Sequence, residues 1–247
     1  MGKKGPSKHL KREMSPKFWP IHRKEHVWTV KTGSGPHAFK ESMPLLVVVR
    51  DLLGYAETGK EAKKLIKYGQ VLVDGKPRRD ERYPLGFMDV VELTDAQQVY
   101  RVLPSHGGKM KLHTIKANEA GFKLCRIVGK ANVKGGGTQL NLHDGRNVVP
   151  PEDDEAQYKV NDVLQLTVPE QEVLGHISFE QGVQAIITGG RSQGKRGVLI
   201  GFGSEPGKKQ TATIRTPDGE DVRTLARYVF AVGSKEPLIS LPEGTGT

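Results

Sequence analysis

The feature of this sequence that most constrains its fold is a series of helix and turn signals in residues 43–93. Thr58 and Glu61 have the spacing of a capping box, in which each side chain bonds the other's backbone amide at the start of a helix. Gly69 suits a helix end, because glycine adopts the left-handed conformation there without strain. These signals predict a short helix between Thr58 and Gly69.

The segments on either side of this helix predict a second helix and a hairpin. Residues 44–53 begin with a proline, which is tolerated in a first helical turn, and Gly54 can end them. Residues 71–73 are apolar and of strand length, and Asp74-Gly75 is typical of a type I′ turn. With a closing strand at residues 90–93, the region predicts a small unit of two helices and a hairpin.

The predicted helix carries lysines along one face. Lysines at i, i+3, i+4 and i+7 share a helix face, and here they are Lys60, Lys63, Lys64 and Lys67. The apolar side chains lie opposite, where they can be buried; these are Ala62, Leu65 and Ile66. Taken alone, such a lysine face is more often a solvated surface than an RNA-binding one.

The order of these features resembles the alpha-L RNA-binding module, also called the S4 domain. The resemblance rests on the capped basic helix, the string Gly-Gln-Val-Leu-Val-Asp-Gly-Lys at residues 69–76, and the pair Arg78-Arg79. It implies that the basic helix and the adjacent hairpin grip an RNA backbone.

Residues 94–168 predict a second unit that is built of β-strands. Short alternating runs are separated by clusters of turn residues, which is the pattern of a small barrel or sandwich. The runs cover residues 98–103, 111–115, 124–128, 138–142 and 163–168.

A glycine-rich loop between two apolar segments marks a third unit. Residues 184–187 and 198–200 predict strands, and the loop between them carries Gly189, Gly190, Arg191, Gly194, Lys195 and Arg196. Backbone amides in such a loop can face phosphate. Residues 175–201 resemble a KOW motif, which belongs to SH3-like barrels; an ordinary glycine-rich hairpin is the alternative. The loop is not a nucleotide-binding phosphate loop, because Arg196 replaces the hydroxyl residue that binds Mg²⁺ and a strand follows instead of a helix.

Positive charge is concentrated at the N-terminus. The chain has a formal net charge of +10, and residues 1–42 hold ten Lys or Arg against three Glu. A basic excess favours a polyanionic partner, because phosphates are neutralised and counterions released. With no periodic apolar face, residues 1–42 are expected to be extended and disordered without RNA. Trp19 is expected to stack on unpaired bases, whereas Trp28 suits stacking and packing against its own domain equally well.

The residues present exclude several chemistries. Cys125 is the only cysteine, so no intramolecular disulfide can form, and we expect an intracellular chain. His22 and His26 have i, i+4 spacing without a third ligand, and His143-Asp144 is better explained as a turn than as a catalytic pair. No apolar run approaches the roughly 20 residues of a spanning helix. We therefore expect no enzyme activity, no cofactor, no metal, no membrane and no small-molecule substrate.

Over nearly the whole chain, the order of parts resembles the archaeal and eukaryotic small-subunit ribosomal protein S4e family, and the modest length favours the archaeal type. The matching strings, besides the KOW segment, are Lys3-Lys4-Gly5-Pro6, His9-Leu10-Lys11-Arg12, Trp19-Pro20 and Leu140-Asn141-Leu142-His143-Asp144-Gly145-Arg146. The resemblance implies a structural constituent of the small ribosomal subunit in the cytoplasm. Its implied partners are ribosomal RNA and neighbouring ribosomal proteins.

The expected fold class is α+β with several modules: a basic extended N-terminal arm, an alpha-L (S4-like) RNA-binding domain, a central β domain and an SH3-like KOW β-barrel. The expected boundaries are 1–42 for the arm, 43–93 for the alpha-L domain, 94–168 for the central β domain, 169–232 for the barrel and 233–247 for a loose C-terminal tail.

The candidate RNA-binding residues are the basic side chains of these parts together with one tryptophan. They are Lys3, Lys4, Lys8, Lys11, Arg12, Lys17, Trp19, Arg23, Lys24, Arg50, Lys60, Lys63, Lys64, Lys67, Lys76, Arg78, Arg79, Arg191, Lys195 and Arg196. Two alternative functions remain open. A KOW-type transcription or translation factor would be expected to lack the arm and the alpha-L module. An RNA-modifying enzyme with an alpha-L module, such as a pseudouridine synthase, would need an Arg-Leu-Asp tripeptide, which this sequence lacks.

Overall fold

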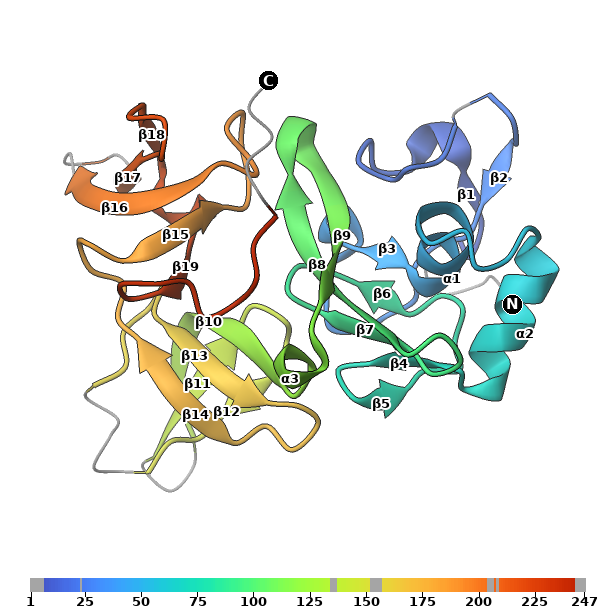
Figure 1. The fold of residues 1–247 in the computed structure, drawn as a ribbon, viewed down its shortest axis with the longest axis horizontal. Coiled ribbons are helices and arrows are strands. Elements are labelled where there is room, and N and C mark those ends of the chain that lie inside the picture. The colour runs from blue at the N-terminus through green and yellow to red at the C-terminus, as the bar shows by residue number, and fades with distance from the viewer. Residues whose placement is uncertain are drawn as a thin grey trace, which may run out of the picture.

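The structure, a computed structural model, describes residues 7–22, 24–133, 137–151, 157–203, 207 and 209–242. Within these residues the fold consists mostly of strands, arranged in three five-stranded and two two-stranded sheets. Figure 1 shows the C-terminal and central sheets on one side of the molecule, and α1 (Leu45–Val47) and α2 (Gly59–Tyr68) with the N-terminal segment on the other. None of the helices in the described part of the chain is long and apolar enough to cross a membrane.

The helical elements are few and short. They are η1 (Arg12–Met14), η2 (Phe39–Glu41), α1 (Leu45–Val47), η3 (Val48–Leu52), α2 (Gly59–Tyr68), α3 (Ala117–Ala120), η4 (His106–Gly108) and η6 (Ala226–Tyr228). The strands of the N-terminal half are β1 (Leu10–Lys11), β2 (Trp28–Thr29), β3 (Met43–Pro44), β4 (Val71–Val73), β5 (Lys76–Pro77), β6 (Pro84–Leu85), β7 (Val90–Leu93), β8 (Gln98–Ser105) and β9 (Lys109–Ile115). Those that follow are β10 (Phe122–Asn132), β11 (Thr138–Leu142), β12 (Asn147–Val148), β13 (Val163–Thr167), β14 (Val173–Ile177), β15 (Gln184–Ile187), β16 (Arg196–Gly203), β17 (Thr211–Arg215), β18 (Asp221–Leu225) and β19 (Val229–Gly233).

The capping box and the hairpin turn predicted in residues 43–93 are present. The Thr58 hydroxyl accepts from the Glu61 amide while the Glu61 carboxylate accepts from the Thr58 amide, and the helix ends at Gly69 with φ +79°. Asp74 and Gly75 both have positive φ, 51° and 71°, as a type I′ turn requires. Local signals alone therefore determine where α2 and the β4–β5 hairpin begin and end.

The helices of this module enclose a continuous apolar core. Residues 45–49, in α1 and η3, are all buried, and α2 contributes Ala62 and Ile66, each with no exposed surface. These side chains pack on Val71 and Val91 of the sheet. Since α2 buries its apolar face, its lysines are left outside.

The strand pairings cross the domain boundaries that we expect at residues 93 and 168. β8 pairs with β7 and β9 with β8, so the sheet of the region that resembles an S4 domain, below called the S4 module, has the order β5-β4-β7-β8-β9 and extends to residue 115. β14 pairs with β13, so the central sheet, β12-β11-β10-β13-β14, extends to residue 177. Short turns cause this, because a strand that follows another after a few residues pairs with it most readily.

The C-terminal sheet has the order β18-β17-β16-β15-β19. β18 and β19 are its two edges, so the pairings among the described residues do not close it into the barrel that we expect. Leu199, Ile214 and Phe230 of this sheet share an apolar cluster with Leu103 of β8 and Leu124 of β10.

The segment after β19 is ordered up to residue 242, where a loose tail was expected. Ile239 is buried, and the Ser240 amide donates a hydrogen bond of 2.9 Å to the Glu119 carboxylate. One aliphatic side chain and one polar anchor thus tie the C-terminal segment to α3.

The expectation that residues 1–42 are disordered without RNA is wrong for the described residues 7–22 and 24–42. β1 pairs with β2, and Leu10 and Trp19 belong to the apolar core of the S4 module. The Gly33 amide donates to the carbonyl of Arg82 at 2.7 Å. The apolar residues of this segment have no regular spacing, because they do not form one face of a helix or strand. They pack one by one on the core of another module.

Candidate nucleic-acid interface

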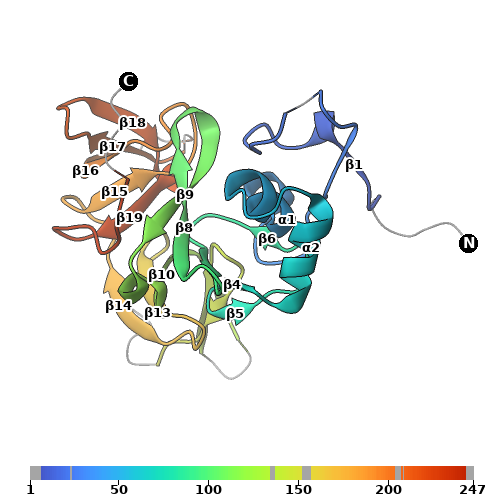
Figure 2. The ribbon, with the colours of Figure 1, turned by 45° about the vertical axis from the view of Figure 1, so that its right-hand side comes forward.

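The lysine face of α2 is on the surface of the molecule. Lys60, Lys63, Lys64 and Lys67 are all exposed, and Figure 2 shows α2 on the outside of the S4 module, away from the central and C-terminal sheets. Lys64 lies over the ring of Tyr68, 5.8 Å from its centroid, and Tyr68 is itself 68% exposed. The face combines positive charge with an aromatic ring that is accessible to solvent.

Lys63 differs from its neighbours because it has a protein partner. Its ammonium lies 2.6 Å from the Glu81 carboxylate. Partial burial acts to raise the pKa of Glu81, but the hydrogen bond and charge of Lys63 outweigh it and lower that pKa. Lys63 therefore fixes α2 to residue 81, and the lysines that remain for a ligand are Lys60, Lys64 and Lys67.

The hairpin next to α2 adds three basic side chains. Lys76 and Arg79 are exposed. Arg78 is half-buried, with its guanidinium 4.6 Å from the centroid of the Tyr83 ring. Among the described residues that guanidinium has no hydrogen bond and no ion pair. The hairpin thus presents one stacked and two solvated cations.

Two of the N-terminal candidates are buried and do not contribute to the surface. Arg12 Nε donates to the His22 carbonyl at 3.2 Å, and its other N–H groups bond Ser15 and Ile21. Trp19 is 2% exposed and donates from Nε1 to the Ser42 carbonyl at 2.9 Å, so the expected stacking of Trp19 on RNA bases is wrong. Trp19 is buried because its large aromatic ring removes more apolar surface from water than the smaller side chains of this segment.

The other N-terminal candidates that the structure describes are exposed: Lys8, Lys11, Lys17 and Lys24. Lys3, Lys4 and Arg23 lie outside the described residues. Trp28, for which packing and stacking were equally good interpretations, is 58% exposed and lies 5.8 Å from the ring of His9. Trp19, which was expected to stack on bases, is therefore buried, and Trp28 is the tryptophan whose ring is accessible to a ligand.

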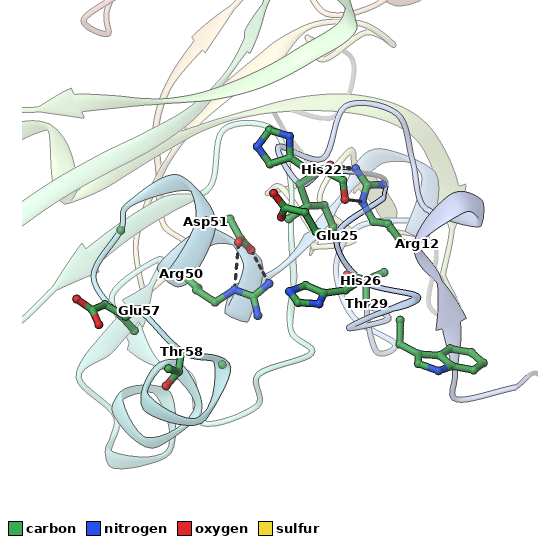
Figure 3. Close-up of a pocket in the computed structure, with 14 residues that line it drawn as sticks. Arg12, His22, Glu25, His26, Thr29, Arg50, Asp51, Glu57 and Thr58 are labelled. Carbon is green, nitrogen blue, oxygen red and sulfur yellow. Dashed lines mark hydrogen bonds and ion pairs between the residues drawn. The ribbon is translucent and has the colours of Figure 1, made fainter.

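A cleft of about 590 Å³ separates the N-terminal segment from the start of α2 (Figure 3). The Arg50 guanidinium lies within it but forms a fork on Asp51, with both contacts at 3.0 Å. The positive end of α2 is also occupied, because the Glu61 carboxylate accepts from the amides of Glu57 and Thr58. Because the carboxylates of Glu25 and Glu57 also line it, the cleft is not a strong phosphate site.

The glycine-rich loop packs on the β8–β9 hairpin. The amides of Gln193, Gly194 and Lys195 donate to carbonyls of the same loop and of β15, at 3.3, 2.8 and 3.2 Å. A Cβ at Gly194 would lie 2.8 Å from the backbone of Ser105 and His106. The expectation that the loop amides face phosphate is therefore wrong for these three.

The basic residues of the loop are divided between protein and solvent. Lys195 lies 2.5 Å from the carboxylate of Glu220, whereas Arg191 is exposed and Arg196 is half-buried. Only Arg191 among them projects fully from the surface.

A buried ionic cluster, which the motifs did not predict, joins the modules. Lys123 of β10 is 1% exposed, and its ammonium lies 3.0 Å from Asp74, 2.5 Å from Asp89 and 3.1 Å from Asp144. Arg146 bridges Asp74 and Asp144 at 2.5 and 3.3 Å. The only sequence signal was that Lys123 alternates in phase with the buried Cys125 and Ile127.

The charges of this cluster stabilise one another. Burial acts to raise the pKa of Asp144, but Lys123 and other nearby positive charge lower it to about 2. Conversely, burial acts to lower the pKa of Lys123, and the three carboxylates raise it well above its usual value. Lys123 and Asp144 therefore both keep their charges at neutral pH.

Cys125, His143 and Asp144 place three ligand atoms within 4.8 Å of one another. Their donors are already committed, however. His143 Nδ1 accepts from the Arg126 amide at 3.2 Å, and the Cys125 thiol, whose pKa burial raises, lies 3.4 Å from Asp144. Lys123 also places its positive charge on that carboxylate. This chemistry suits a structural network and not a cation site.

Comparison with known proteins assigns the chain to a family. Family models match residues 4–40 (RS4NT domain), 43–91 (S4 domain) and 96–173 (Ribosomal family S4e). A small ribosomal subunit protein eS4 from Methanothermobacter thermautotrophicus is 50% identical over 238 residues, covering 96% of this chain and 97% of that protein. The chain belongs to the ribosomal S4e family. An S4e relative from Ignicoccus hospitalis is 49% identical, with 97% of each chain covered.

The fold agrees with this assignment. The crystal structure of the 30S ribosomal protein S4e from Thermoplasma acidophilum matches with a TM-score of 0.68 and 30% identity, covering 78% of this chain and 96% of that one. The S4 match at residues 43–91 confirms the alpha-L module, which contains α2 and the β4–β5 hairpin. The S4e family is a ribosomal family and not an enzyme family.

Proposed function

We propose that this S4e-family chain is a structural constituent of the small ribosomal subunit that binds ribosomal RNA. Its relatives carry the name small ribosomal subunit protein eS4, and its S4 domain is an RNA-binding module. The observation that carries the proposal is the exposed lysine face of α2 beside the basic β4–β5 hairpin.

The S4 module supplies a rigid basic surface. Lys60, Lys64 and Lys67 act as point charges on successive phosphates, because their stems stand on one face of a capped helix. Arg79 and Lys76 extend the same positive surface along the hairpin. Since both elements pack on one apolar core, their spacing is fixed before RNA binds.

The N-terminal segment and the C-terminal sheet extend the proposal. Lys8, Lys11, Lys17 and Lys24 are exposed and add positive charge beside the S4 module. Residues 184–203 have the strand, glycine-rich loop and strand of a KOW motif, and Arg191 is the side chain of that loop best placed to contact RNA.

Two further parts of the proposal concern the place of the chain and its neighbours. As a ribosomal protein it acts in the cytoplasmic ribosome, packed against rRNA and neighbouring small-subunit proteins. Neither a transcription factor nor an RNA-modifying enzyme is favoured, because matches to ribosomal proteins cover nearly all of the chain.

A triple charge reversal on α2 tests the proposal. Lys60→Glu, Lys64→Glu and Lys67→Glu together should weaken binding to a small-subunit rRNA transcript without unfolding the protein, because Ala62 and Ile66 stay buried. Each lost phosphate contact should reduce the magnitude of the log–log salt slope by roughly 0.7 to 0.9. Filter binding across a salt series measures both quantities.

The matched control reverses three exposed lysines outside the S4 module, Lys159, Lys209 and Lys235. It makes the same change in net charge and should reduce the slope less. Equal effects of the two triple variants would show that net charge, and not the face of α2, binds the RNA.

A further inference from the structure

A cavity of about 380 Å³ opens where the S4 module, the central sheet and the N-terminal segment meet. Its walls come from Pro36, from Arg78 and Tyr83 beside the S4 hairpin, and from the turn between β11 and β12 that holds Arg146. Lys123 of the ionic cluster also lines it. This turn is the Asp144-Gly145-Arg146 part of a family-matching string, and the proposed function gives it no role.

The acceptors around the cavity are already occupied. Asp74 Oδ1 accepts from the Val90 amide at 3.0 Å, and its Oδ2 bonds Lys123 and Arg146. Asp144 Oδ1 accepts from the Arg146 amide at 3.2 Å, and its Oδ2 lies 3.1 Å from Lys123. No carboxylate oxygen at the cavity is left without a donor.

The groups that remain are donors. Arg146 uses Nε and Nη2 on the two carboxylates, and its Nη1 has no partner. The Arg78 guanidinium lies over the ring of Tyr83, its Nε has no partner, and no described residue forms an ion pair with it. Two guanidinium groups from different modules therefore line one cavity, and each has a buried N–H group without a protein partner, which favours a ligand that supplies acceptors.

We propose that this cavity binds one phosphodiester group of the RNA, held between the guanidinium groups of Arg78 and Arg146. The proposal rests on the proposed function and adds to it a binding residue in the central sheet. Phosphate oxygens match the guanidinium fork, and both forks are fixed before binding, one by stacking and one by two ion pairs. A phosphate here would link the S4 module to the central sheet.

The charge balance defines how such a site works. Lys123, Arg78 and Arg146 are offset by Asp74 and Asp144 of the cavity lining and by Asp89, which also bonds Lys123, so little net charge remains at the cavity. Attraction must then come from directed hydrogen bonds more than from bulk charge. Replacing either arginine with lysine should therefore reduce affinity and leave the salt slope almost unchanged, because lysine keeps the charge but not the fork.

Phosphate-ethylation interference on a small-subunit rRNA transcript tests the proposal. With the wild-type protein, ethylation of one particular phosphate, or of two adjacent ones, should block binding. That same position should cease to interfere with both Arg78→Lys and Arg146→Lys, and each variant should bind about tenfold more weakly. Other interfering positions should be unchanged.

The matched control is Arg227→Lys, because the Arg227 guanidinium also lies over a tyrosine ring, 4.7 Å from the centroid of Tyr228, but Arg227 does not line the cavity. It should reproduce the wild-type pattern. Variants that keep every wild-type interfering position, or that lose two distant ones, would overturn the proposal. If circular dichroism shows that Arg146→Lys is misfolded, Arg78→Lys decides alone, since it removes no hydrogen bond of the described fold. Failure of the wild-type protein to bind the transcript would instead contradict the proposed function.

Discussion

His143 is kept neutral by the geometry of its two ring nitrogens. The Arg126 amide donates to Nδ1 at 3.2 Å, and Nε2 lies 3.3 Å from the Phe87 carbonyl, which can only accept. A proton on Nδ1 would therefore point at the N–H of the Arg126 amide, and the hydrogen bond between them would be lost. Burial of the ring, which packs on Phe87 and Phe230, lowers the pKa of His143 to about 3 in spite of the nearby Asp144.

This side chain should make the fold sensitive to mild acid. Below about pH 6.5 His143 becomes protonated in the unfolded chain, whereas in the folded chain it stays neutral down to about pH 3. The proton therefore favours the unfolded chain, and the free energy of unfolding falls as the pH falls. The loss is at most about 1.4 kcal/mol per pH unit. Urea unfolding between pH 7 and pH 4 should show a shallower decline for His143→Gln than for the wild type.

The exposed His9 provides the control for this measurement. His9→Gln should keep the wild-type pH dependence, because the side chain of His9 lies on the surface and is not enclosed by the fold. If the three proteins lose stability in parallel, His143 is not the group responsible.

Among the elements, the glycine-rich loop and the β8–β9 hairpin illustrate how a motif can act through protein contacts. Gly194 has φ +87° and lies against the backbone of Ser105 and His106, while the Gln193 side chain donates to the Lys109 carbonyl at 3.0 Å. Gly194 therefore serves both the turn and the close approach of two elements from different sheets.

Two alanine substitutions separate these demands. Gly194→Ala and Gly219→Ala both place a Cβ at positive φ, +87° and +82°, which costs on the order of 1 kcal/mol. Only Gly194→Ala also forces a Cβ to 2.8 Å from backbone atoms; at Gly219 nothing lies within 4 Å. The free energy of unfolding in urea should fall clearly more for Gly194→Ala, and equal losses would mean that the loop does not pack on the hairpin.

For the whole molecule, segments at both ends of the chain connect the modules. The N-terminal segment buries Trp19 in the S4 core, and the C-terminal segment bonds α3 through Ser240 and Glu119. Together with the Lys123 cluster and an apolar cluster that includes Leu103, Leu124 and Phe230, these contacts hold the three five-stranded sheets together.

Trp19 and Trp28 test the folded state of the N-terminal segment. Trp19→Ala should reduce the free energy of unfolding by roughly 3–5 kcal/mol, because it removes a ring that is 2% exposed. Trp28→Ala, at 58% exposure, should change it by about 0.5 kcal/mol or less. Urea denaturation of the RNA-free protein measures both, and a Trp19→Ala variant as stable as the wild type would show that the segment is unfolded without RNA.

Local signals in the sequence determined the bounds of α2 and of the β4–β5 hairpin, and the order of these signals indicated the family. The capping box of Thr58 and Glu61, the stop at Gly69 and the Asp74-Gly75 turn act within a few residues, so their outcome is independent of the rest of the fold. The lysine face of α2 follows for the same reason, because helical spacing alone brings its members together.

Only the tertiary structure decided what depends on contacts between distant residues. Trp19 is buried and Trp28 exposed because another module covers the first and not the second. Arg78 and Arg146 are far apart in the sequence, and they line one cavity because the Lys123 cluster binds carboxylates from two sheets. Periodicity describes which face of an element is apolar, but it does not specify which element will cover that face.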